Sequence, residues 1–150
     1  MSKKSTLWKK GRGKLGVLDP LLGTWNAQVD TPMGKARCSR TFTSVLGEKY
    51  VQLDAKWDFG KFVYHEHAIF GVLDSKLTFW SFTSDGKHSE GALADGKDIH
   101  PEAICFEAQM PTGLARMVYS PNEDGSMTWA VEAKNKKGWK RFTEHRYVKG

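Results

Sequence analysis

The sequence predicts an all-β protein that folds as one antiparallel up-and-down β-barrel of about ten short strands. Apolar and polar residues alternate with a period of two through most of the chain after Gly23. Short turn sequences rich in Gly, Pro, Asn and Asp separate these segments at regular spacing, and no segment among them reads as a helix. Pairing each strand with its sequence neighbour and closing the sheet removes the exposed edges, which favours a barrel over the alternative, a two-sheet sandwich.

The N-terminal segment 1–13 is expected to be a flexible basic leader. The net charge is +6, but six of the 23 basic residues precede the first acidic residue, Asp19, so the remaining basic residues balance the 17 acidic ones. A solubilising tail fits better than a nucleic-acid-binding arm, because no basic cluster recurs later to form a groove. No nucleic-acid partner is therefore expected.

Residues 14–150 are expected to form the barrel domain, preceded by one short helical turn. The apolar stretch Lys14–Leu22 contains Pro20 and suits a single 3₁₀ turn, which would pack over a barrel opening or against the outer wall. No apolar run is long enough for a transmembrane helix, and Leu7-Trp8 is followed by two lysines, unlike a signal peptide. With only two cysteines, the expectation is a cytoplasmic protein without membrane insertion.

The strands are expected in regular succession. The first begins at Gly23 and ends at the turn Thr31–Gly34, and in the third Val51, Leu53, Ala55 and Trp57 form an inward face. An Asp-Gly hairpin closes the fifth and sixth strands, and residues 94–102 are the longest irregular segment. After the first, the expected strands cover about 36–44, 50–57, 62–70, 77–83, 88–93, 104–110, 114–120, 127–134 and 139–148.

Two motifs resemble the calycin superfamily, which includes lipocalins and fatty-acid-binding proteins: Gly23-Thr24-Trp25 on the first strand, and Arg146-Tyr147 on the last. In detail the chain is similar to an uncharacterised bacterial family of calycin-like barrels, through LLGTW, VLGEKYV, FGVLD, WSFTSDGK and RFTEHRY. The resemblance implies that Trp25 closes the barrel floor, with Arg146 as a basic residue beside it. It implies no known activity.

The sequence departs from two ligand-binding patterns of related barrels. Fatty-acid-binding proteins use Arg-x-Tyr on the last strand, whereas Arg146 and Tyr147 are adjacent and point to opposite faces. Haem-binding barrels of the nitrobindin type use a His in an apolar setting, whereas His145 lies between polar residues. No cofactor is therefore assigned.

A buried cation is the main indication of a ligand site. Arg40 shares a face with Cys38 and Phe42, and a buried guanidinium needs an anion, either Glu66 or Glu107 or the acid group of a ligand. The same alternation places Arg116 on the face of Val118, and Glu107 on the face of Cys105. Polar groups among aromatic residues inside a barrel usually accompany water or a ligand. The predicted ligand-binding residues are Arg40, Tyr64, Glu66, Trp80, Glu107, Met117, Tyr119 and Trp129.

His65-Glu66-His67 is the sharpest local pattern. Residues i and i+2 of a strand share a face, so both imidazoles could reach one metal ion if another strand supplied a third ligand such as Glu90, Glu107 or His145. Apolar residues lie on both faces, with Val63 and Ile69 beside the histidines and Phe62, Tyr64, Ala68 and Phe70 beside Glu66, so the sequence leaves open which face of 62–70 is inside. No metal ligand is assigned.

Catalytic motifs are not evident. The chain has no Gly-x-Ser-x-Gly elbow, phosphate-binding glycine loop or Cys-x-x-Cys, and Cys38 and Cys105 lie in apolar settings that favour inert thiols. The function expected is binding of a small apolar or amphipathic ligand inside the barrel. An enzyme using Glu66 beside Tyr64 or a His-based metal site, and a structural barrel with a filled core, are the alternatives.

Overall fold

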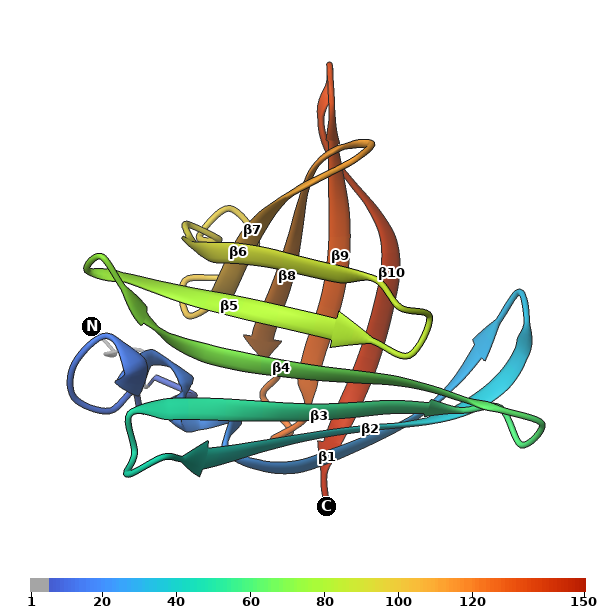
Figure 1. Cartoon of the computed structure of the whole chain (residues 1–150), viewed down its shortest axis with the longest axis horizontal. Coiled ribbons are helices and arrows are strands. Elements are labelled where there is room, and N and C mark those ends of the chain that lie inside the picture. The colour runs from blue at the N-terminus through green and yellow to red at the C-terminus, as the bar shows by residue number, and fades with distance from the viewer. Residues whose placement is uncertain (1–5) are drawn as a thin grey trace.

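Ten antiparallel strands form one closed barrel in the computed structural model, which describes residues 6–150 (Figure 1). One 3₁₀ helix, η1 (Leu15–Leu21), precedes them. The strands are β1 (Gly23–Thr31), β2 (Gly34–Val45), β3 (Tyr50–Asp58), β4 (Val63–Leu73), β5 (Lys76–Thr83), β6 (His88–Ala94), β7 (Ile104–Met110), β8 (Gly113–Pro121), β9 (Met127–Asn135) and β10 (Gly138–Lys149).

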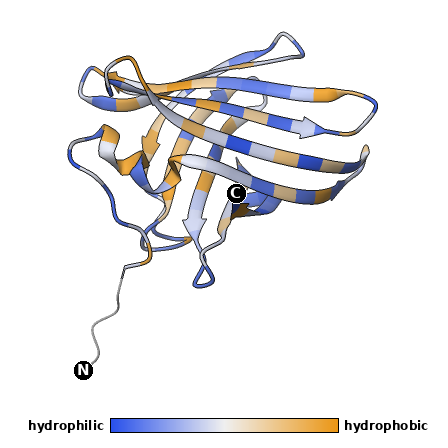
Figure 2. Ribbon diagram, turned by 90° about the horizontal axis from the view of Figure 1, so that it is seen from below, coloured by the Kyte–Doolittle hydropathy of each residue, from blue (hydrophilic) through white to orange (hydrophobic). Residues whose placement is uncertain are grey.

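Every strand pairs with its neighbour in sequence, and the first and last strands close the ring. β1 pairs with β2 along its whole length, but with β10 only through Trp25 opposite Lys149 and Asn26 opposite Val148. The expected all-β barrel and its strand ranges are confirmed, and closure excludes the two-sheet sandwich. Hydrophobic and hydrophilic residues alternate along the ribbons, as the period of two predicts (Figure 2).

The inward faces pack an aromatic core. The Phe70 ring lies 5.1 Å from that of Phe106 and 6.0 Å from that of Phe79, measured between centroids, and Phe42 packs edge-on against Tyr119. Aromatic pairs at such separations add to the stabilisation from burial. The aromatic residues therefore fill the barrel on the side of η1.

Helix η1 closes one end of the barrel. Leu18 and Leu21 are fully buried and join the same core as Trp25, whose indole Nε1 donates to the carbonyl oxygen of Leu21 at 2.8 Å. The basic residue beside Trp25 is Lys149, whose Nζ lies 4.5 Å from the indole centroid. Arg146, expected in that position, is exposed and pairs with Asp124. The reason is alternation: Tyr147 points inward, so Arg146 points outward.

The segment before η1 contacts the barrel. The backbone N–H groups of Leu7 and Trp8 donate to the Glu102 carboxylate at 2.9–3.0 Å, and these bonds hold the pKa of Glu102 below its usual range. Trp8 also packs against the core. Of the leader expected at 1–13, residues 1–5 lie outside the described residues. No helix within 6–150 is long and apolar enough to cross a bilayer.

The loop between β6 and β7 covers part of the outer wall. Asp98 in this loop binds Arg116 on β8, and Gly96 lies against Cys105 on β7. Cys105 and Val118 are therefore buried although they lie on the outer face. The inward position expected for Arg116 is wrong, because its strand neighbour Met117 contacts the buried Arg40 and Tyr119 inside the barrel, while Arg116 pairs with Asp98 of the loop.

Candidate functional site

The register of β3 and β4 decides which face of β4 is inside. Ala55 lies opposite Glu66, and Trp57 opposite Tyr64, so Tyr64 and Glu66 share the inner face of the buried Ala55. His65 and His67 consequently point outward. The question that the sequence leaves open at 62–70 is thereby answered.

A cavity of about 670 Å³ opens inside the barrel beyond the packed aromatic core. Its wall combines aromatic and aliphatic side chains with a few polar ones. The lining residues include Trp57, Tyr64, Glu66, Ser81, Met117 and Trp129. A second hollow of about 400 Å³ shares Trp57, Tyr64 and Trp129 with it and reaches His145. Ligand pockets in proteins are typically about 300–1,000 Å³.

Arg40 lies at the inner limit of this cavity and is fully buried. Its Nη2 donates to the Tyr119 hydroxyl at 2.9 Å, and its guanidinium carbon lies 4.7 Å from the Trp129 ring centroid. Two cavity-lining groups are close to the same Nη2: the Met117 sulfur at 3.9 Å and the Glu66 Oε1 at 3.8 Å. The positive charge therefore borders the cavity and is held by π faces as much as by hydrogen bonds.

Glu66 compensates this charge only at a distance. Its Oε2 accepts a hydrogen bond from Ser81 at 2.5 Å, whereas Oε1 stays 3.8 Å from Arg40, beyond hydrogen-bond length. Its side chain is 16% exposed. The carboxylate is thus oriented by Ser81 toward the cavity rather than paired tightly with the guanidinium.

Five buried polar atoms around Arg40 have no hydrogen-bond partner among residues 6–150. They are Nε and Nη1 of Arg40, Nε1 of Trp129, Nδ1 of His145 and the hydroxyl of Tyr147. The rings of Trp129, His145 and Tyr147 lie 5.1–6.4 Å apart between centroids, so the atoms belong to one cluster. Buried polar groups in folded proteins are nearly always paired, and each unpaired one costs about 1–3 kcal/mol.

The protonation states make this cluster rich in donors. Burial raises the pKa of Tyr119 and that of Tyr147, so both hydroxyls keep their protons at neutral pH. Burial, followed by the charge of Arg40, lowers the pKa of His145, so its imidazole is neutral. Arginine remains protonated in proteins. The cluster therefore offers one positive charge and several N–H and O–H groups to an acceptor.

The two thiols take no part in this chemistry. Burial raises the pKa of Cys38 and of Cys105 to about 11. A protonated, buried thiol is a poor nucleophile and a poor metal ligand. The interpretation of both cysteines as inert is consistent with these values.

Six of the eight predicted ligand-binding residues come together at the cavity, and two do not. Arg40, Tyr64, Glu66, Met117, Tyr119 and Trp129 line it or lie directly behind its wall. Trp80 alternates with Phe79 and Ser81, which face the cavity, so it lies on the outer face of β5. Glu107 likewise alternates with Phe106 and Ala108 and lies outside β7.

Sequence reasoning overlooked three members of the cluster. Trp57 was expected to face inward, but not to lie beside Arg40, 5.8 Å from its guanidinium carbon. His145 and Tyr147 share the inner face of β10 and are buried there. Their i, i+2 spacing on the last strand could have placed them on one face. The polar neighbours Glu144 and Arg146 made the segment look exposed, although these two side chains point outward.

Sequence comparisons offer no guide to this site. No model of a protein family matches the chain, and no curated protein is similar to it in sequence. The candidate site therefore rests on the geometry of the barrel interior.

Proposed function

We propose that the barrel binds a small amphipathic molecule in its interior, with an acid group of that molecule toward Arg40. The observation that carries the proposal is the cluster of unpaired donors of Arg40, Trp129 and Tyr147 beside a cavity of about 670 Å³. These donors are buried behind the cavity wall, so a carboxylate, which has two acceptor oxygens, would satisfy several of them at once by displacing side chains of that wall.

The rest of the cavity suits the apolar part of such a molecule. The side chains of Trp57, Phe106, Met117 and Val131 form its wall, with Lys87 and Lys134 also among its lining residues. Aromatic walls with a few placed polar groups are the usual composition of small-ligand sites. An acid with a medium-length hydrocarbon chain combines both features.

The family and the cellular location of the protein are part of the same proposal. A closed ten-strand antiparallel barrel is compatible with a calycin-like fold, and the LLGTW and RFTEHRY motifs support membership of the uncharacterised bacterial family that they resemble. Buried, protonated Cys38 and Cys105 agree with a cytoplasmic protein. In this proposal the protein is a carrier or sensor of its ligand, without a catalytic role.

Native mass spectrometry of the full chain purified from cells, followed by titration with a fluorescent fatty acid, tests the proposal. Trp129→Phe keeps an aromatic ring but removes the unpaired N–H, and should weaken fatty-acid binding. Trp139→Phe is the matched control, because Trp139 stacks on Arg116 outside the barrel at 4.4 Å. Binding should be unchanged in this control.

Two results would overturn the proposal. One is the absence of both a co-purified small molecule and any saturable binding of the fatty acid, which would favour a structural barrel. The other is turnover of the bound molecule that is lost in Glu66→Gln, which would favour an enzyme.

A further inference from the structure

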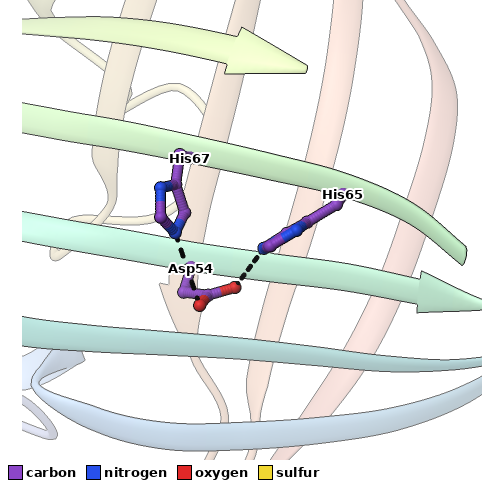
Figure 3. Close-up of side chains that lie close together, drawn as sticks. All are labelled: Asp54, His65 and His67. Carbon is purple, nitrogen blue, oxygen red and sulfur yellow. Dashed lines mark hydrogen bonds and ion pairs between the residues drawn. The ribbon is translucent and has the colours of Figure 1, made fainter. Parts of the chain in front are cut away.

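We infer that Asp54, His65 and His67 form a binding site for one divalent transition-metal ion on the outer face of β3 and β4 (Figure 3). The site lies on the opposite face of β4 from Tyr64 and Glu66, so it is independent of the proposed interior ligand.

Strand geometry brings the three side chains together. His65 and His67 are two residues apart on β4 and project from the same face, and Asp54 on β3 lies directly opposite His67. The imidazole rings lie 5.1 Å apart between centroids. Because both strands are internal to a closed sheet, the three Cα positions are held by the barrel rather than by a loop.

Both histidines direct the same ring nitrogen at one carboxylate. His65 Nε2 lies 2.6 Å from Asp54 Oδ1, and His67 Nε2 lies 3.5 Å from Asp54 Oδ2. Figure 3 shows the two rings approaching the carboxylate from β4. One ligand atom from each residue can be chosen so that all lie within 4.8 Å of one another.

These separations bracket those of a tetrahedral ion, which would replace the direct hydrogen bond between His65 and Asp54. Two ligands at about 2.0–2.1 Å from zinc lie ~3.3 Å apart at the tetrahedral angle. The side chains of His65 and His67 are 38% and 57% exposed, so their rings can rotate by the small amount needed to close the set. Three protein ligands leave a fourth position open for water.

The donor set selects the metal. Two neutral imidazoles and one carboxylate suit zinc, nickel or copper, whereas magnesium and calcium prefer oxygen ligands alone. Lys56 lies opposite His65 on the same face and carries a charge that opposes a cation. Its flexible side chain can turn toward solvent, where it is already exposed.

Zinc binding by the full-length protein without an affinity tag provides the test. Competition with a fluorescent zinc chelator should give one zinc ion per chain, displaced by nickel or copper but not by magnesium. Asp54→Asn, His65→Gln and His67→Gln should each weaken zinc binding by about tenfold or more, because each removes one ligand.

His88→Gln is the matched control. His88 is an exposed histidine on β6, which β5 separates from β4; its ring is tilted against that of Phe82, and it lies outside the set of three. Zinc binding should be unchanged in it. In the wild type, zinc should shift the ring NMR signals of His65 and His67 and leave that of His88 in place.

Three results would overturn the inference. Zinc binding below one ion per chain would exclude the site, provided that the protein is folded by circular dichroism. Unchanged binding in the double variant His65→Gln/His67→Gln would place the metal elsewhere. Equal loss in His88→Gln would indicate nonspecific binding to surface histidines.

Discussion

The molecule contains two buried arginines, Arg40 inside the barrel and Arg116 under the β6–β7 loop. They differ in how fully neighbouring carboxylates and hydrogen-bond acceptors pair with their guanidinium groups. Arg116 donates to both oxygens of Asp98 at 2.7–3.1 Å and to Glu132 at 2.8 Å, and it lies over the Trp139 ring. Arg40 makes one hydrogen bond to a hydroxyl, has its nearest carboxylate oxygen at 3.8 Å, and leaves two nitrogens unpaired.

In the proposed function, this difference separates a structural ion pair from a site prepared for a ligand. Around Arg116 every charge has a partner within the fold, and Glu132 is shared with Arg141 at 2.9 Å. Around Arg40 the protein keeps a desolvated charge and several donors unpaired, at a cost to its own stability. Such an arrangement is expected where a second molecule supplies the acceptors.

The largest expected effect on stability is at Arg116. Arg116→Met leaves Glu132, only 6% exposed, with a weaker set of partners, so the free energy of unfolding should fall by about 3 kcal/mol. Urea denaturation monitored by tryptophan fluorescence measures it. Arg146→Met removes an exposed pair and should leave the denaturation midpoint unchanged. A change at Arg116 no larger than that at Arg146 would contradict the structural role.

Arg40→Met should lower stability far less, by about 1 kcal/mol or less. The substitution removes a poorly compensated buried charge, and Glu66 keeps its bond to Ser81. The same urea denaturation, done without added ligand, makes the comparison with Arg116→Met direct. A loss at Arg40 equal to that at Arg116 would show that Arg40 is a structural residue.

Tyr147→Phe should stabilise the unliganded protein by about 1 kcal/mol. The hydroxyl of Tyr147 is fully buried next to Arg40 and Cys38 but makes no hydrogen bond of normal geometry within residues 6–150, so its removal relieves a poorly met hydrogen bond while the ring is kept. Thermal unfolding should therefore shift to higher temperature. Tyr50→Phe, with a partly exposed ring on β3, is the control. Destabilisation by Tyr147→Phe would mean that its hydroxyl has a partner in the protein.

The smallest expected effect is on how the free energy of unfolding depends on pH. The folded protein lowers the pKa of His145, which faces Arg40 and Tyr147, whereas the unfolded residue titrates near pH ~6.5. Below that pH the unfolded state binds more protons, so stability should fall as the pH drops and stay level above it. His145→Gln should reduce this slope in urea denaturation between neutral and mildly acidic pH. An unchanged slope would show that His145 is not buried.

Much of the fold could be predicted because one periodicity dominates. In Tyr50–Asp58 the inner positions are apolar and the outer ones polar, which fixes both the strand and its face. Turn residues mark the ends, as with the positive φ of Gly86 in the Asp-Gly hairpin. Local patterns of this kind need no knowledge of the neighbouring strands.

The candidate site could be predicted only in part, because pairing between strands decides it. On β4 both faces carry apolar residues, and only the register with Ala55 and Trp57 places Glu66 inside and His65 outside. On β7 and β8 the loop that carries Asp98 buries the outer face, so an apolar neighbour such as Val118 no longer indicates the interior. Glu107 was misplaced for that reason. Alternation along 50–57 is enough to place Asp54 on the outer face, but its position opposite His67 depends on register.

Displacement of a fluorescent fatty acid by decanoate and by decanol tests the central claim most directly, since the two competitors differ only in the acid group. In the wild type decanoate should compete about tenfold better than decanol or more, because hydrogen bonds to a charged group contribute about 1.5–3 kcal/mol. In Arg40→Met this preference should disappear while decanol binds as before. Equal competition by the two compounds in the wild type, or a preference for decanoate that persists in Arg40→Met, would contradict an acid-binding site at Arg40.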